Sequence, residues 1–145
     1  MATVEKSVLV GFSAEKMYEL VERIEDYPQF LPWCGGTVVG GRSPGRTVGT
    51  IRIDYHGIKQ SFTTENDNDA PRQIRMRLVD GPFRKLDGTW EFLALGQLGC
   101  RIDFRLHYEF SSRIIEKLVG PVFNHIANTL VEAFVKRAEV LKKTG

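Results

Sequence analysis

The last third of the chain, from about residue 111 to residue 143, carries its apolar residues at helical spacing. The residues that form this stripe are Ile115, Leu118, Val119, Val122, Phe123, Ile126, Leu130, Phe134, Ala138 and Leu141. The spacing predicts one amphipathic helix and not a strand. A helix of about 32 residues extends roughly 48 Å, so it must lie across another layer of the fold. Gly120 and Pro121 are expected to bend or break it.

Residues 35–111 alternate between apolar and polar positions in short runs that are separated by turn residues. Turn signals lie at residues 43–45, 56–57, 67–71, 80–82 and 96–99. About five or six strands are expected between them, as in an antiparallel meander. The clearest run places Ile102, Phe104, Leu106, Tyr108 and Phe110 on one face and charged residues on the other, which is typical of a sheet with one wet face. Gly88 is expected to allow a bulge that tightens the curl of the sheet.

The N-terminal part of the chain predicts one strand and two short helices. Alternation from residue 4 to residue 10 predicts a strand that ends at Gly11. Ser13 is expected to cap a helix, and Asp26 a further turn with Pro28 in its first residues. The predicted fold class is α+β, with one long curved antiparallel sheet whose apolar face is covered by the terminal helix. Residues 1–145 are expected to form a single domain.

The sheet and the terminal helix each present an apolar face to the other. The sheet face carries Phe62, Met76, Leu78, Trp90, Phe92, Phe104, Leu106 and Tyr108. The helix face carries Val122, Phe123, Ile126, Leu130 and Phe134. These residues either fill each other's space as a core or line a cavity, because a straight helix across a strongly curved sheet leaves a gap of the kind that ligands occupy. Periodicity does not decide between the two.

Composition and charge narrow the range of partners without selecting one. The chain has 20 basic and 18 acidic residues, and its lysines and arginines are scattered, so no DNA partner is expected. Cys34 and Cys100 lack a zinc-binding spacing and are expected to be reduced thiols. No signal-peptide pattern and no uninterrupted apolar run near the ~20 residues of a membrane span is found. A cytoplasmic protein is expected, with peripheral binding to the inner membrane left open.

Two longer motifs and the end of the chain carry a family resemblance. Residues 27–34 read Tyr-Pro-Gln-Phe-Leu-Pro-Trp-Cys, residues 80–92 read Asp-Gly-Pro-Phe-Arg-Lys-Leu-Asp-Gly-Thr-Trp-Glu-Phe, and residues 133–138 read Ala-Phe-Val-Lys-Arg-Ala. In this order they resemble the coenzyme Q-binding branch of the START-like superfamily, which also carries the labels polyketide cyclase/lipid transport and ribosome-association toxin. The resemblance implies the helix-grip (START/Bet v 1-like) fold, a seven-stranded antiparallel sheet wrapped around a long C-terminal helix and a lipid-sized tunnel. It implies ubiquinone or a similar polyprenyl lipid as the ligand, with no cofactor required.

The resemblance also implies roles for individual residues. Phe30, Leu31, Pro32 and Trp33 would form the mouth beside the helix, where an indole can pack on a quinone ring and still reach a polar partner. The alternative is that Pro32 and Trp33 only fasten the short helices to the sheet. Phe83 would be a mobile gate, or else a turn aromatic that rests on the rim of the sheet. A tunnel of several hundred Å³ would favour a lipid ligand, and a packed interior would oppose it.

No catalytic group of residues stands out from the sequence. The glycine and histidine spacings match neither a nucleophile elbow, nor a phosphate-binding loop, nor a metal site. Asp103, Arg105, His107 and Glu109 share the strand face that points away from the helix, where solvation explains them. His125 could hydrogen-bond a ligand carbonyl, although an exposed helix face also explains it. Because a cyclase needs a positioned acid or base, the chain is not expected to be an enzyme.

Three functions remain open at this point. The first is a non-catalytic carrier or chaperone for ubiquinone or a related lipid, which supports respiratory electron transfer and touches the inner membrane transiently. The second, implied by the ribosome-association label, is binding to the large ribosomal subunit so that subunit joining is blocked. Its support in the sequence is a set of cations that could gather at one sheet edge, namely Arg72, Arg75, Arg77, Arg84 and Lys85. The third is a polyketide cyclase, and the carrier is the preferred interpretation.

Overall fold

The computed structural model describes residues 2–144, so the outermost positions of the predicted 1–145 domain lie outside the described residues. Its elements are β1 (Ala2–Val10), α1 (Ala14–Glu22), the 3₁₀ helix η1 (Ile24–Gln29), β2 (Cys34–Ser43), β3 (Arg46–Tyr55), β4 (Ile58–Asp69), β5 (Gln73–Asp80), β6 (Phe83–Leu95), β7 (Gly99–Phe110) and α2 (Arg113–Thr144). The strands form one antiparallel sheet in the order β1-β7-β6-β5-β4-β3-β2. The predicted α+β helix-grip fold is confirmed, with α1 and η1 as the two short helices.

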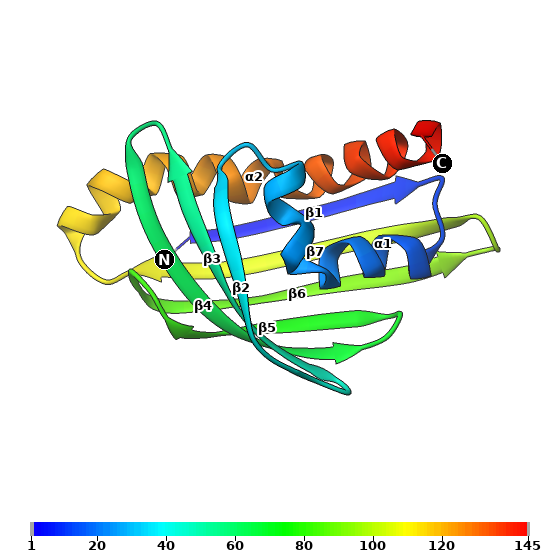
Figure 1. Cartoon of the computed structure of the whole chain (residues 1–145), viewed down its shortest axis with the longest axis horizontal. Coiled ribbons are helices and arrows are strands. Elements are labelled where there is room, and N and C mark those ends of the chain that lie inside the picture. Colours follow the sequence, from blue (N-terminus) through cyan, green and yellow to red (C-terminus); the bar gives the residue numbers. More distant parts are fainter. Residues whose placement is uncertain (1, 145) are drawn as a thin grey trace.

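The sheet is strongly curved. In Figure 1, β1, β7 and β6 run nearly along α2, whereas β2, β3 and β4 cross it steeply. Register shifts occur in the β2–β3, β4–β5 and β6–β7 pairs, and such bulges bend a strand. The bulge predicted at Gly88 is wrong, because Gly88 stays in register between Met76 and Leu106. A Cβ atom at Gly88 would lie 2.7 Å from Met76 Cε, 3.0 Å from Leu106 Cδ1 and 3.2 Å from the Arg105 carbonyl oxygen, so these neighbours favour glycine there and would have to shift for a side chain.

Helix α2 lies along the concave face of the sheet, as its apolar stripe predicts (Figure 1). The residues that it buries are Val119, Phe123, Ile126, Ala127, Val131, Phe134 and Ala138. Of the bend or break predicted at Gly120 and Pro121, the break is wrong, because the helix continues through Pro121. Pro121 and Lys117 are both exposed, so water can satisfy the Lys117 carbonyl that loses its N–H partner. Residues 113–143 are long and apolar enough to span a membrane by length and composition, a test that core helices also pass.

Of the two predicted helix N-caps, the one at Ser13 is confirmed and the one at Asp26 is not. The Lys16 amide donates to Ser13 Oγ at 3.2 Å, so Ser13 is the N-cap of α1 as predicted. The prediction that Asp26 caps the second helix is wrong, because η1 begins at Ile24 and Asp26 lies in its first turn. The Asp26 side chain instead accepts a hydrogen bond from Arg23 Nε at 2.9 Å.

A cluster of four aromatic side chains connects α2 and η1 to the sheet. Phe134 on α2 is fully buried, and its ring meets those of Trp90, Tyr27 and Phe30 edge-on at centroid distances of 5.4, 5.3 and 5.4 Å. These rings come from β6, from η1 and from the residue after η1. Edge-to-face pairs of this kind add to the stabilisation from burial, so they hold α2 and η1 at a fixed height above the sheet. The space beside this group is the candidate site.

Candidate ligand site

An apolar cavity of about 70 Å³ lies between α2 and the concave face of the sheet. Its lining comes from η1, the residue before β2, strands β3 to β7, and α2. At roughly 10–15 Å³ for one water, this space has room for a few small groups. It is smaller than the ~150 Å³ apolar cavity that admits benzene and far below the ~300–1,000 Å³ of ordinary ligand pockets. The interior is therefore mostly packed, and the wide tunnel expected from the resemblance is not open in this structure. The volume of the cavity by itself opposes a lipid-sized ligand, which would fit only if the cavity became larger.

Many of the residues predicted as ligand-binding meet at this cavity. Those that line it are Trp33, Phe62, Met76, Trp90, Phe104, Leu106, Phe123, Ile126 and Leu130. Most of these side chains are buried, but Phe62, Met76 and Leu130 are only half-buried. The structure thus joins residues from the predicted sheet face, the predicted helix face and the predicted mouth in one site.

The other predicted residues lie elsewhere. Phe30 and Pro32 line a groove on the outer side of α2, and Leu31 is buried in the core. Phe83 and Tyr108 pack with Phe110 and Phe123 in an aromatic group beneath the start of α2. The remaining positions are Phe92, which packs on Tyr18 and Trp90, and Leu78 and Val122, which are half-buried outside the cavity lining.

Two polar side chains in the cavity wall were missed from the sequence. Thr64 and Asn66 are buried on the inner face of β4, and Thr64 Oγ1 donates to Asn66 Oδ1 at 2.9 Å. This bond occupies the Asn66 carbonyl and leaves its amide N–H groups available as donors. Residues 63–69 are all polar, so hydropathy does not mark the inward positions, but strand alternation from Phe62 places Thr64 and Asn66 on its face. The other lining residues that were missed are Ile24, Tyr27, Gly49, Ile51, Leu86 and Ala127.

The described cavity wall offers no group that is suited to acid–base catalysis. It contains no carboxylate, histidine, lysine or cysteine among residues 2–144. The Tyr27 hydroxyl donates to the Val21 carbonyl, and burial raises the pKa of Tyr27 far above its usual range. Burial also raises the pKa of the Cys34 and Cys100 thiols, which are both unpaired and lie outside the cavity lining. The site can exclude water and donate a hydrogen bond, but its wall supplies no general base.

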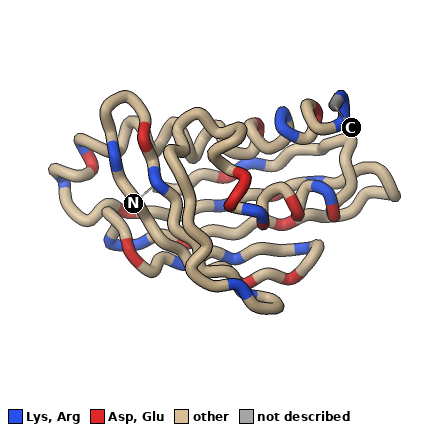
Figure 2. The backbone as a smooth tube through the Cα atoms, in the orientation of Figure 1, with Lys and Arg blue, Asp and Glu red and all other residues tan. Residues whose placement is uncertain are grey.

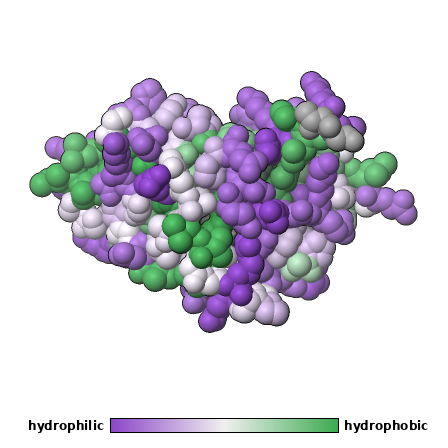
Figure 3. All heavy atoms as spheres, in the orientation of Figure 1, coloured by the Kyte–Doolittle hydropathy of each residue, from purple (hydrophilic) through white to green (hydrophobic). Residues whose placement is uncertain are grey.

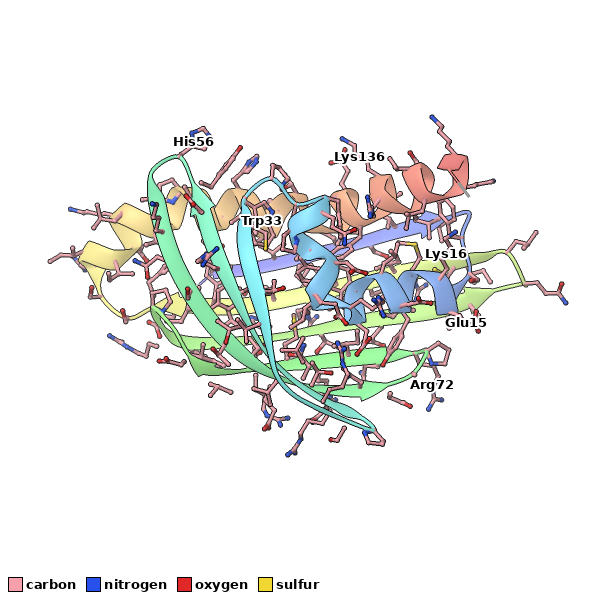
Figure 4. All side chains as sticks on the ribbon, viewed as in Figure 1. Glu15, Lys16, Trp33, His56, Arg72 and Lys136 are labelled. Carbon is pink, nitrogen blue, oxygen red and sulfur yellow. The ribbon has the colours of Figure 1, made fainter. Side chains whose placement is uncertain are left out.

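Trp33 separates the cavity from a second, open space. It lines both the cavity and a groove of about 410 Å³ on the outer side of α2. Figure 4 shows Trp33 beside α2 and Lys136 on α2. The other groove residues are Phe30, Pro32, Tyr55, His125, Thr129, Glu132, Ala133, Lys136, Arg137 and Val140. The Arg137 guanidinium lies 5.1 Å from the centre of the Phe30 ring, so part of the groove wall is a cation–π pair.

Charged groups elsewhere on the surface are mostly paired. The cations predicted to gather at a sheet edge instead lie on the central strands β5 and β6 and in the β4–β5 turn. Four of these five cations pair with carboxylates, through Arg72–Asp69, Arg77–Glu65, Arg77–Asp67, Arg84–Glu109 and Lys85–Asp87 contacts. Figure 2 shows positive and negative residues interspersed along the chain. No three His, Cys, Asp or Glu side chains in the described part of the chain are grouped to hold a metal ion.

The fold agrees with the comparisons to known proteins. A family profile described as polyketide cyclase / dehydrase and lipid transport matches residues 10–135. The chain belongs to this family. Among its relatives, the ribosome association toxin RatA of Escherichia coli (strain K12) is 42% identical over 139 residues, which are 96% of this chain and 88% of the relative. The mitochondrial coenzyme Q-binding protein COQ10 homolog B of Xenopus laevis is 29% identical over 138 residues, 92% of this chain and 56% of the relative.

A solved structure extends the comparison to the level of the superfamily. A START superfamily protein from Mycobacterium smegmatis is 27% identical and superimposes with a TM-score of 0.78, covering 96% of this chain and 98% of that one. The predicted membership of the START-like superfamily is therefore confirmed. The names of the RatA and COQ10 relatives state a ribosome association and a coenzyme Q association, and neither states a catalysed reaction.

Proposed function

We propose that this protein binds a hydrophobic ligand of the polyprenyl quinone class beneath α2 without converting it, and supports respiratory electron transfer as a carrier. The observation that carries the proposal is the cavity, whose wall is apolar and aromatic except for Thr64 and Asn66. Such a wall suits an isoprenoid chain or a quinone ring, which gain from burial and from contact with aromatic faces. The absence of a general base among the described lining residues supports binding rather than catalysis.

The polar pair in the cavity wall supports a particular head-group chemistry. Because Thr64 occupies the Asn66 carbonyl, the Asn66 amide N–H groups can donate to an acceptor on the ligand. A quinone carbonyl is such an acceptor, and an oxidised quinone has no hydroxyl donor of its own. We therefore expect tighter binding of an oxidised short-chain ubiquinone than of its quinol, and replacement of Asn66 by leucine should remove this preference.

The small volume of the cavity means that a ligand must enlarge it. Trp33 forms the wall between the 70 Å³ cavity and the 410 Å³ outer groove, so its movement would join the two spaces. The half-buried Leu130 and Met76 side chains border the same cavity and have several rotatable bonds with which to adjust. The joined volume falls in the range of ordinary ligand pockets.

Mass spectrometry of the lipids that copurify with the protein tests this proposal. Protein expressed in bacteria is extracted with organic solvent, and the extract is compared with that of an Asn66→Leu variant of equal thermal stability. Ubiquinone should accompany the wild-type protein, and the purified apoprotein should bind the oxidised form more tightly than the quinol in a fluorescence titration. Repeated preparations without any prenylated quinone, together with no binding in the titration, would exclude the proposal.

Ribosome association is a second candidate, because the RatA relative is similar along almost the whole chain. Binding to the large ribosomal subunit would involve the exposed cations of β5 and β6, although most of these already pair with carboxylates. Phosphate contacts are strongest at low salt, so co-sedimentation with ribosomal subunits in low-salt buffer is the sensitive test. Failure to co-sediment there would remove this candidate and leave the quinone proposal untouched.

A further inference from the structure

The β6–β7 hairpin ends in an exposed segment without a charged residue. Residues 93–98 read Leu-Ala-Leu-Gly-Gln-Leu, and all six are exposed. The exposed fractions of Leu93, Leu95 and Leu98 are 49%, 48% and 81%. Single apolar residues are normal on a protein surface, but several together mark an interaction site. Figure 1 shows that this hairpin projects at one end of the molecule.

A fourth leucine extends this surface onto the neighbouring strand. Leu9 near the end of β1 is 74% exposed and pairs with Arg101 of β7, which in turn pairs with Leu93 of β6. The two leucines therefore lie on either side of one arginine on the outer face of the sheet. We call Leu9, Leu93, Leu95 and Leu98 the leucine end. Figure 3 shows apolar surface at this end of the molecule, beside the C-terminal helix.

Charged side chains of both signs border the leucine end, where Glu15, Arg72, Glu91 and Arg101 line one groove with Leu93 and Ala94. Two lysines lie near its Leu9 side. Phe12, three residues after Leu9, has the ammonium groups of Lys16 and Lys142 at 5.6 and 6.0 Å from its ring centre. In Figure 1, the end of β1 and the C-terminal turn of α2 lie at the same end of the molecule as the hairpin. Figure 4 places Glu15 beside Lys16 at the start of α1, so the border is not purely cationic. The nearby Asp103 already pairs with Arg101 at 3.1 Å.

An apolar tip with bordering lysines is complementary to an anionic lipid surface. Apolar side chains enter the boundary between head groups and acyl chains, while lysines remain at the level of the phosphates. A second copy of the chain would instead gain from a flat, extended contact, and a projecting hairpin offers little such area. A second exposed apolar site at the start of α2 has only two large exposed apolar residues, Ile114 and Leu118, and the charged residues Arg113, Glu116 and Lys117 lie around them in the sequence.

We propose that the leucine end is a docking site for an anionic lipid bilayer. Leu95 and Leu98 enter the interfacial layer, Leu9 and Leu93 rest at its edge, and Lys16 and Lys142 contact phosphate groups. This inference stands on exposure and charge at this end of the molecule, and it is independent of the ligand that occupies the cavity. It predicts reversible, salt-sensitive binding, because the lysine contribution is screened by added ions.

Vesicle co-sedimentation tests the proposal. The probe is mixed phosphatidylethanolamine and phosphatidylglycerol vesicles, compared with pure phosphatidylcholine vesicles. A Leu95→Ser/Leu98→Ser variant should partition at least tenfold more weakly than the wild type, and a Lys16→Gln/Lys142→Gln variant should lose most of the preference for the anionic vesicles. The matched control is Ile114→Ser/Leu118→Ser, which removes two equally exposed apolar side chains at the other site and should bind like the wild type.

The substituted leucines and Ile114 are exposed, so these variants should fold like the wild type. Circular dichroism melts of every variant check this before the binding data are compared. The proposal is overturned if the wild type ignores anionic vesicles or if the Leu95→Ser/Leu98→Ser variant binds like the wild type. It is also overturned if only the Ile114→Ser/Leu118→Ser control loses binding. A wild-type dimer that becomes monomeric in the Leu95→Ser/Leu98→Ser variant would identify a second copy of the chain as the occupant instead. A Leu98→Trp variant adds a direct readout, since its new fluorescence should shift to the blue with anionic vesicles alone.

Discussion

Filling the cavity with a larger side chain separates its role in binding from its role in stability. Ala127 lies on the inner face of α2, is buried, and borders the 70 Å³ space. At ~24 cal/mol per Å³ of unfilled volume, this space costs the folded state about 1.7 kcal/mol. Ala127→Leu adds three carbon groups, worth ~0.8 kcal/mol each when buried. The loss of leucine rotamer freedom, ~0.5–1 kcal/mol, and packing strain of ~1–3 kcal/mol oppose this gain.

The expected net effect is stabilisation of the folded protein by about 1 kcal/mol, together with at least tenfold weaker quinone binding. Urea denaturation followed by circular dichroism gives the free energy of unfolding, and the lipid titration gives the affinity. The control for the stability measurement is Ala133→Leu, which makes the same change on α2 at a half-buried position that lines the outer groove and not the cavity, so only its free energy of unfolding is compared. It should leave the cavity volume and its contribution to stability unchanged.

Two results would refute this reasoning. Destabilisation of Ala127→Leu by more than about 1 kcal/mol would mean that the space cannot accept a side chain from α2. Stabilisation with unchanged quinone affinity would mean that the ligand binds elsewhere. The expected result, an Ala127→Leu variant that is more stable and no longer binds quinone, would show that the wild-type cavity stays open at a cost in stability, as is common for binding cavities.

Two further predictions concern stability. Hydrogen bonds from Arg42 at 2.8 and 3.0 Å lower the pKa of Glu25 to about 2, so this pair should stabilise the fold above about pH 4.3 and lose its effect as the pH falls towards 2. Glu25→Gln should therefore cost about 1 kcal/mol at pH 7, and urea denaturation should show a smaller cost at pH 3. Gly88→Ala should destabilise by about 1 kcal/mol in the same assay, because its Cβ meets Met76 and Leu106. An unchanged midpoint would show that these side chains move aside freely.

The elements with strong periodicity were predictable from the sequence alone. The stripe of apolar residues defines α2 to within a few residues of its observed ends, and strict alternation defines β7. Both patterns report which face of an element is buried, and burial is the dominant local demand on these residues. The N-cap at Ser13 was predictable for a similar reason, because a side-chain oxygen at that position satisfies an amide two or three residues away.

Features that depend on the spacing between elements were not predictable. Gly88 was assigned to a bulge, whereas its role comes from Met76 and Leu106 on two other strands. Pro121 predicts a bend or a break, whereas its position on the exposed side of α2 lets the helix continue without a break. Thr64 and Asn66 share the inward face of Phe62 by strand alternation, but only the tertiary structure shows that this face borders a cavity.

The sequence by itself determined the fold class, the family and the apolar face beneath the terminal helix. Only the tertiary structure decided how much of the space at that face is filled. The physical reason is that a cavity is a small difference between two large volumes, the space that curvature encloses and the side chains that occupy it. Hydropathy measures neither volume, so the same pattern is compatible with a packed core, with the observed 70 Å³ cavity, or with an open tunnel.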